Sequence, residues 1–214
     1  MFIGHFALGF ASKGIDKRPS LGTMFMAVQW LDLLWPVFIL TGVEKVKIEP
    51  GNTELTPLNF EYYPWSHSLL MAVGWGLLFA LFYSVITKNS KSAVLLFFLV
   101  VSHWVLDWFV HRPDLPLTPF SEIKLGLGLW NYKWIEIIIE TILLIIGILI
   151  YLKTTKPKNK VGIWAFWSLV LFLIVVHFMN VSGPPPPNVK LIGWIGLSQW
   201  LLVAWAYWID RNRV

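Results

Sequence analysis

The chain has 214 residues, of which 57% are hydrophobic and 14% are charged, and its mean hydropathy is +0.65. Soluble domains carry about 25% charged residues, so this composition excludes an ordinary soluble protein. The apolar residues form continuous runs without alternation, which predicts helices that cross a bilayer and excludes a β-barrel. Cysteine is absent, which excludes disulfides and thiolate metal sites. The net charge of +5 resides in the loops and does not indicate a nucleic-acid partner.

The apolar runs, taken in chain order, predict the membrane spans. Residues 1–15 are apolar but short, and predict either a short span or a re-entrant helix. They lack the basic start of a signal peptide, so we expect them in the mature protein. Each later run has about the 20 residues that cross a bilayer core. These runs are residues 21–41, 64–87, 92–111, 130–152, 161–181 and 190–209. We expect Pro36 to kink the first of them. The sequence therefore predicts one all-α transmembrane domain over residues 1–214, with six transmembrane helices plus a short N-terminal helix, six to seven spans in total.

Lysine and arginine alternate between the loops along the chain. They are concentrated in every second loop, at residues 12–20, 88–91, 153–160 and 211–214. Loops of this kind stay in the cytoplasm, so we expect a cytoplasmic C-terminus and, if the first segment crosses, an external N-terminus. The expected location is a bacterial or archaeal cell membrane.

One predicted span carries three ionisable residues at intervals of four. His103, Asp107 and His111 therefore share one helical face. Imidazole and carboxylate groups are ligands of zinc, manganese and iron. An aspartate near the centre of a membrane helix costs about 2.5–3.5 kcal/mol, which favours a functional role. The alternative is a buried hydrogen-bonded network that joins helices.

The loop charges place nearly all the embedded ionisable residues in the outer half of the membrane. The run from His103 to His111 rises about 12 Å, which is too long for one ion and predicts two or more. The predicted metal ligands are His5, Asp32, His67, His103, Asp107 and His111. Histidine and aspartate without lysine favour zinc, with manganese as the alternative, over magnesium.

The predicted chemistry is hydrolysis by an activated water. Two ions clamp the attacking and leaving oxygens of a phosphoester. Glu136 and Glu140 are predicted catalytic residues, as a general base or as a partner that orients a ligand histidine. A proton relay is the alternative for this pair. We interpret His177 as a core or interfacial histidine.

The order of these residues also resembles a known family. His5 comes first, followed by a Leu-Asp-Leu-Leu-Trp-Pro segment that holds Asp32. Ser66-His67-Ser-Leu-Leu and then His103-x-x-x-Asp complete the pattern. Over about residues 1–112 the chain resembles the bacterial YdjM-like family of membrane-bound metal-dependent hydrolases. Gln29 stands near the place of a second family aspartate, and Tyr-Pro-Trp-Ser replaces an Arg-Gly pair. The order is also similar to that of zinc-dependent phospholipase C and related nucleases, although their later His-x-x-x-Glu pair is missing unless Glu136 and Glu140 replace it in part.

The leading hypothesis is a membrane-embedded metal-dependent hydrolase whose substrate is a phosphoester or a lipid that enters laterally. One alternative is a proton-coupled transporter, whose polar residues would extend across both leaflets. Another is a non-catalytic metal-binding membrane protein, whose site would be closed. The surplus of ligands and their common depth favour the hydrolase. The expected partners are a lipid or small-molecule substrate and the membrane, without nucleic acid, and the oligomeric state stays open.

Overall fold

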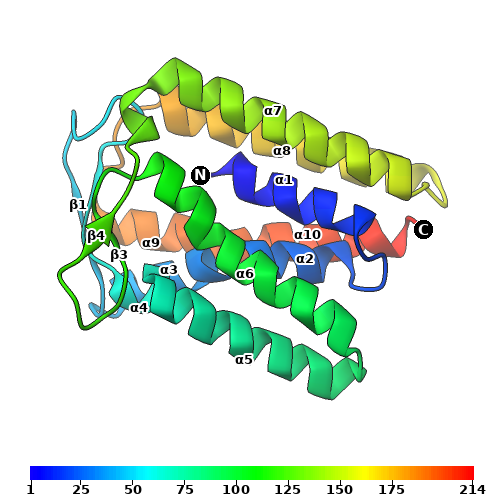
Figure 1. Cartoon of the computed structure of the whole chain (residues 1–214). Helices are drawn as coiled ribbons and strands as arrows, with labels where there is room; N and C mark the ends of the chain where they lie inside the picture. Colours follow the sequence, from blue (N-terminus) through cyan, green and yellow to red (C-terminus); the bar gives the residue numbers. More distant parts are fainter.

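The computed structural model describes residues 1–214 and shows a bundle of helices with small β-ribbons at one end (Figure 1). The α-helices are α1 (Ile3–Ala11), α2 (Leu21–Val28), α3 (Trp30–Leu40), α4 (Pro64–His67), α5 (Leu69–Thr87), α6 (Ser90–Val110), α7 (Lys133–Thr154), α8 (Lys160–Ser182), α9 (Val189–Leu197) and α10 (Gln199–Arg211). Two short 3-10 helices are η1 (Ser12–Gly14) and η2 (Leu129–Asn131). The strands are β1 (Lys45–Ile48), β2 (Leu58–Tyr62), β3 (Leu115–Pro116) and β4 (Lys124–Leu125).

Five helical segments are long and apolar enough to cross a membrane. They are α5, α6, α7, α8 and the consecutive pair α9–α10, over Val189–Arg211. Helices α2 and α3 reach this length only together, and a bend of 55° makes them a broken span or a re-entrant loop. Helix α1 rises only about 14 Å, less than half of a bilayer core, so it does not cross alone. The protein is a helical membrane protein, and the total of six to seven spans stays a prediction.

The bend between α2 and α3 falls at Gln29, whereas Pro36, where the sequence predicted a kink, lies within a continuous helix. Gln29 has a ψ of 7°, outside the helical range, and this residue redirects the chain. Pro36 lies inside α3, and its ring packs closely against Gly196 of α9. A β-carbon at Gly196 would collide with that ring, so the glycine permits the close approach of the two helices.

The connectors at one end are not pure coil, which corrects the all-α prediction. Strands β1 and β2 pair antiparallel, with Val46 opposite Phe60, and β3 pairs antiparallel with β4. The sequence of β1 alternates lysine with an aliphatic residue, which is the pattern of a strand with one covered face. The β1–β2 ribbon buries Val46 and lies at the same end of the bundle as β3 and β4 (Figure 1).

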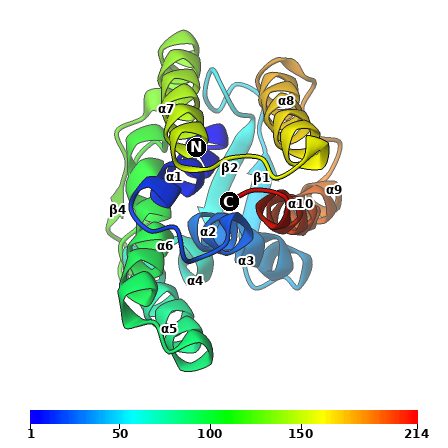
Figure 2. The same cartoon turned by 90° about the vertical axis from the view of Figure 1, so that its right-hand side faces the viewer.

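Helix α1 lies inside the bundle, next to α2, α6 and α7, although it is short (Figures 1 and 2). Phe6 and Phe10 are fully buried in a cluster with aromatic side chains such as Phe166 of α8. Gly147 of α7 lies against the backbone of Ala7, so the two helices pack closely. This packing holds a helix that is too short to span the membrane, and it fixes the position of the residues on α1.

The outer surface of the bundle is apolar. Leu81 and Phe82 of α5 and Leu149 of α7 are among many large apolar side chains that are more than half exposed. A soluble monomer does not expose apolar surface on this scale, whereas a bilayer covers it. The connections α1–α2, α5–α6 and α7–α8 lie at the same end as the C-terminus (Figure 1). The four basic loops thus share one end, and the β-ribbons occupy the other.

Candidate metal site

Five of the predicted ligands converge from four helices. His5 lies on α1, Asp32 on α3, His67 on α4, and His103 and Asp107 on α6. They form two groups in which potential ligand atoms lie within 4.8 Å of one another: His5, His103 and Asp107, and Asp32, His67 and His103. Only Asp32 is partly accessible, with 25% of its side chain exposed, while the other four residues are buried. The site therefore has one open side, next to Asp32.

Four of these atoms form a compact cage. The Nε2 atom of His67 lies 3.3 Å from Asp32 Oδ1 and 3.8 Å from Asp107 Oδ2. The Nε2 atom of His103 lies 3.7 Å and 3.2 Å from the same two oxygens. Zinc bonds of 2.0–2.2 Å in a tetrahedron would separate neighbouring ligand atoms by about 3.3–3.6 Å. The four nitrogen–oxygen separations lie near this range, while the groups of ligand atoms within 4.8 Å hold Asp32 and Asp107 separately, each with His103.

A backbone contact fixes the orientation and tautomer of His103. Its Nδ1 atom lies 2.7 Å from the carbonyl oxygen of Val28, which can only accept a hydrogen bond. The Nδ1 atom therefore carries a proton, and Nε2 faces the carboxylates of Asp32 and Asp107. This Nε2 atom is buried without a hydrogen-bond partner, which is costly unless a cation lies between it and the carboxylates. The donor set therefore fits a divalent metal.

A different partner orients His67. Ser66 Oγ donates to Glu44 Oε2 at 2.6 Å, and Glu44 Oε1 accepts from the Ser66 amide at 2.8 Å. The same hydroxyl lies 2.7 Å from His67 Nδ1. Because its only proton goes to Glu44, the hydroxyl accepts from Nδ1–H, and His67 Nε2 faces the cage. Burial raises the pKa of Glu44, and the two bonds from Ser66 oppose this shift.

Sequence reasoning missed the roles of Glu44 and Ser66. Glu44 lies in a polar connector and is only 2% exposed, because the chain after α3 folds back against α4. Its contact with Ser66 spans 22 residues, so no helical spacing signals it. The only available signal was the serine directly before His67.

His5 extends the cage toward α1. Its ring stacks on that of His103, with centroids 3.7 Å apart, and its Nε2 atom lies 3.1 Å from Asp107 Oδ1. This oxygen also accepts a hydrogen bond from the amino group of Met1 at 2.7 Å. The Asp107 carboxylate therefore faces both ligand groups, one with each oxygen. The Nε2 atoms of His67 and His103 each face an oxygen of both Asp32 and Asp107, so their cage is the better-formed candidate for a cation.

The structure places His111 in neither ligand group. Helix α6 ends at Val110, so the predicted helical face does not continue to His111. His111 Nδ1 instead lies 2.9 Å from Asp114 Oδ1 and 3.2 Å from the hydroxyl of Tyr63. Burial raises the pKa of Tyr63 well above its usual value, so the phenol stays protonated and donates to Asp114.

The two predicted catalytic glutamates have different surroundings. Glu140 accepts hydrogen bonds from the backbone amides of Phe2 and Gly4, at 3.1 Å and 2.8 Å. It thus caps the N-terminus of α1 from a neighbouring helix, where a negative charge is favourable. Glu136 is fully buried, and neither of its oxygens has a partner. Neither glutamate belongs to a ligand group, but Glu140 positions the helix that carries His5.

His177 lies apart from the ligand groups. It lines a mainly apolar cavity of about 180 Å³ between α1, α7 and α8, together with residues such as Ile3 and Leu144. This position agrees with the interpretation of His177 as a core histidine.

Comparison with known proteins supplies the family. The profile of the family described as "YdjM inner membrane protein" matches residues 64–183, which is more than half of the chain. The match extends from α4 to the end of α8 and includes His67, His103 and Asp107, whereas His5 and Asp32 precede it. The searches of curated proteins and of solved structures gave no match. The chain is an integral membrane protein and belongs to the YdjM inner membrane protein family.

Proposed function

We propose that the protein is a membrane-embedded hydrolase that uses a divalent cation held by Asp32, His67, His103 and Asp107. The observation that carries this proposal is the cage of four ligand atoms, in which the Nε2 atoms of both histidines face carboxylate oxygens. Two histidines and two carboxylates favour zinc, with manganese as the alternative. A second ion would use His5 and the Oδ1 side of Asp107.

We assign different roles in the proposed hydrolysis to different residues. A divalent ion, when bound, supplies Lewis-acid polarisation and lowers the pKa of water. The partly exposed side of Asp32 is the entrance for the substrate. Glu136 is the candidate acid–base residue because its carboxyl group is buried without a hydrogen-bond partner, whereas Glu140 is engaged with α1. The proposed substrate is a phosphoester or a lipid that reaches this entrance from within the membrane.

The proposed orientation follows from the loops. Because the four basic loops share one end of the bundle, we assign that end, with the C-terminus, to the cytoplasm. The cage then lies toward the outer face of the membrane.

Chelation tests the proposal. The purified full-length protein would be assayed with phospholipids and a soluble phosphoester before chelation, after chelation, and after zinc or manganese is restored. We expect hydrolysis that chelation abolishes and the metal restores. Hydrolysis that is indifferent to chelation contradicts the proposal. Solute flux into proteoliposomes that survives chelation, without any hydrolysis, supports a transporter instead.

A further inference from the structure

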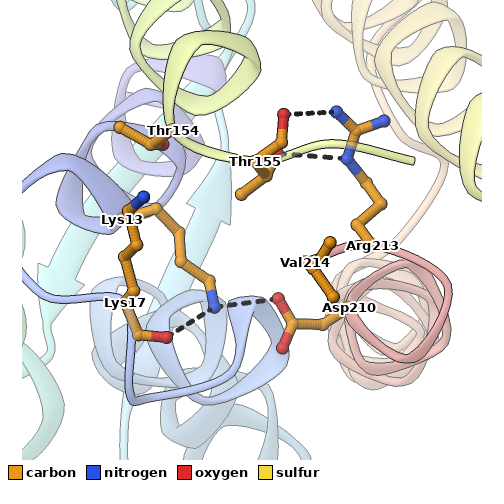
Figure 3. A pocket seen from close by; sticks show the side chains of 7 residues that line it. All are labelled: Lys13, Lys17, Thr154, Thr155, Asp210, Arg213 and Val214. Atoms are coloured by element: carbon orange, nitrogen blue, oxygen red, sulfur yellow. Dashed lines mark hydrogen bonds and ion pairs between the residues drawn. The ribbon is translucent and has the colours of Figure 1, made fainter. Parts of the chain in front are cut away.

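A second polar pocket lies at the opposite end of the bundle (Figure 3). It has a volume of about 130 Å³ and lies between η1, the end of α7 and the segment after α10. Its polar lining consists of Lys13, Lys17, Thr154, Thr155, Asp210 and Arg213. Along α7, about 20 Å separate Thr155 from Glu140, which contacts α1 near the cage. The pocket is therefore distinct from the candidate metal site.

Arg213 is a buried cation without a carboxylate partner. It is only 5% exposed, and its guanidinium group forms no ion pair within 4 Å. Its hydrogen bonds go to neutral acceptors, the hydroxyl of Thr155 at 3.1 Å and the carbonyl of Gly162 at 3.0 Å. The guanidinium also lies 5.3 Å and 5.1 Å from the ring centroids of Tyr151 and Phe166. These contacts orient the cation, but they do not neutralise a charge whose burial is costly.

The other charges in the pocket leave an excess of positive charge. Lys13 is 5% exposed, pairs with Asp210 at 2.9 Å, and donates to the carbonyl oxygen of Lys17 at 3.2 Å. The ammonium group of Lys17 has no partner. Three cationic side chains thus face one acidic side chain, and counting the carboxyl group of Val214 as well still leaves an excess of positive charge. This excess of positive charge favours an anion as the ligand.

The depth of the pocket indicates where such an anion comes from. Trp164, in the second turn of α8, is 72% exposed, and Trp208, near the end of α10, is 49% exposed. Tryptophan side chains at helix ends favour the headgroup level of a bilayer. Basic pockets between membrane helices on the cytoplasmic side bind anionic headgroups. We propose that this pocket binds a phosphate anion at the level of the lipid headgroups, with Arg213, Lys13 and Lys17 as its cationic partners.

The test is a binding titration on the full-length protein in a maltoside detergent. The unfolding midpoint would be followed against phosphatidylglycerol, phosphatidylcholine and inorganic phosphate at constant ionic strength. We expect a saturable rise with a phosphate anion and none with zwitterionic phosphatidylcholine. Lys17→Gln should weaken the apparent affinity about fivefold, because each lysine near an anionic surface contributes about 1 kcal/mol. Arg213→Gln should abolish the response. Lys91→Gln, an exposed lysine of α6 at the same end, should not change it.

The outcomes separate the sources of the anion. A response to phosphatidylglycerol alone supports a lipid headgroup as the ligand, and a response to inorganic phosphate supports free phosphate. Either result supports the anion site. The proposal is overturned if no anion raises the midpoint, if phosphatidylcholine acts equally, or if Lys17→Gln responds like the wild type. If Arg213→Gln does not fold, Lys17→Gln decides, because the Lys17 ammonium makes no contact that the fold requires.

Discussion

The two ends of the helix bundle carry opposite imbalances of buried charge. At one end, Asp32 and Asp107 face the Nε2 atoms of two histidines, and at the other, Arg213 faces neutral oxygens and aromatic rings. A single short segment, α1 with η1, supplies His5 to the first site and Lys13 to the second. Uncompensated charge is costly inside a membrane protein. These opposite imbalances favour the two proposals, a cation ligand at one end and an anion ligand at the other.

The two sites also differ in how far their side chains are held in place before a ligand binds. Val28 and Ser66 fix the histidines of the cage, so that both Nε2 atoms are ready before a ligand arrives. In the basic pocket, Lys17 has no partner and is exposed. We expect selective binding at the cage and weaker binding, set mainly by charge, at the basic pocket.

The largest expected effect comes from the carboxylate that faces both ligand groups. Asp107→Asn keeps the shape of the side chain but removes its charge, so hydrolysis should fall by more than about 100-fold, since even outer partners of metal ligands contribute 10–100-fold. His177→Ala is the control, because this buried histidine lies outside both ligand groups, and it should retain activity. Initial rates at saturating metal check this prediction. Equal rates for Asp107→Asn and the wild type would show that the cage does not take part in the reaction.

Substitutions of two neighbouring serines test whether Ser66 orients His67 in the cage. Ser66→Ala removes the acceptor at His67 Nδ1 and should weaken metal affinity by about 10–100-fold. Ser68→Ala removes the N-cap of α5 and should cost about 1 kcal/mol of stability without changing metal affinity. Competition with a metal-sensitive dye measures the affinity, and thermal unfolding measures the stability. If both variants bind metal like the wild type, Ser66 and Glu44 do not position His67.

The two glutamates of α7 should respond differently to the same substitution. Glu140→Gln replaces one of two amide acceptors by a donor and should destabilise the fold by about 1–3 kcal/mol. Glu136→Gln should leave stability unchanged or raise it, because the carboxylate has no partner, while hydrolysis falls. Chemical unfolding together with rate measurements separates the two effects. Full hydrolysis by Glu136→Gln would show that Glu136 is not the acid–base residue.

The smallest expected effect concerns Asp16, whose carboxylate already has hydrogen-bond partners. Asp16 accepts hydrogen bonds from Arg18 and from Ser92 Oγ, and the bonds from Arg18 hold the pKa of Asp16 well below its usual range. A lowered folded pKa stabilises the fold above the ordinary aspartate pKa, and this contribution fades as the pH falls through that value toward the folded pKa. Asp16→Asn should therefore lower the unfolding midpoint by about 1 °C at pH 7 and by less near pH 3. A larger loss at acid pH would contradict this sign.

Sequence patterns predicted the long helices and much of the cage. Continuous apolar runs mark the spans, and the loop charges placed Asp32, His67, His103 and Asp107 at one depth, where they meet. The assignment by depth was informative because side chains on different membrane helices can contact one another only when they lie at a similar depth.

The apolar runs and loop charges did not predict where a helix ends or which residues far apart in the chain contact one another. His111 was assigned to the stripe because the spacing continues, but the end of α6 at Val110 turns it toward Asp114. The contact between Glu140 and the start of α1 was also missed, because no pattern in α7 signals it. The basic pocket joins Lys13 to Arg213 from opposite ends of the chain, which only the folded bundle reveals.

Metal content tests the central claim most directly. Elemental analysis of the purified, folded protein should find about one zinc or manganese ion per chain, or more if His5 and Asp107 hold a second ion. His103→Ala should lose this metal, whereas His177→Ala should keep it. A folded wild-type protein that remains metal-free after exposure to zinc and manganese would contradict the proposed cation site.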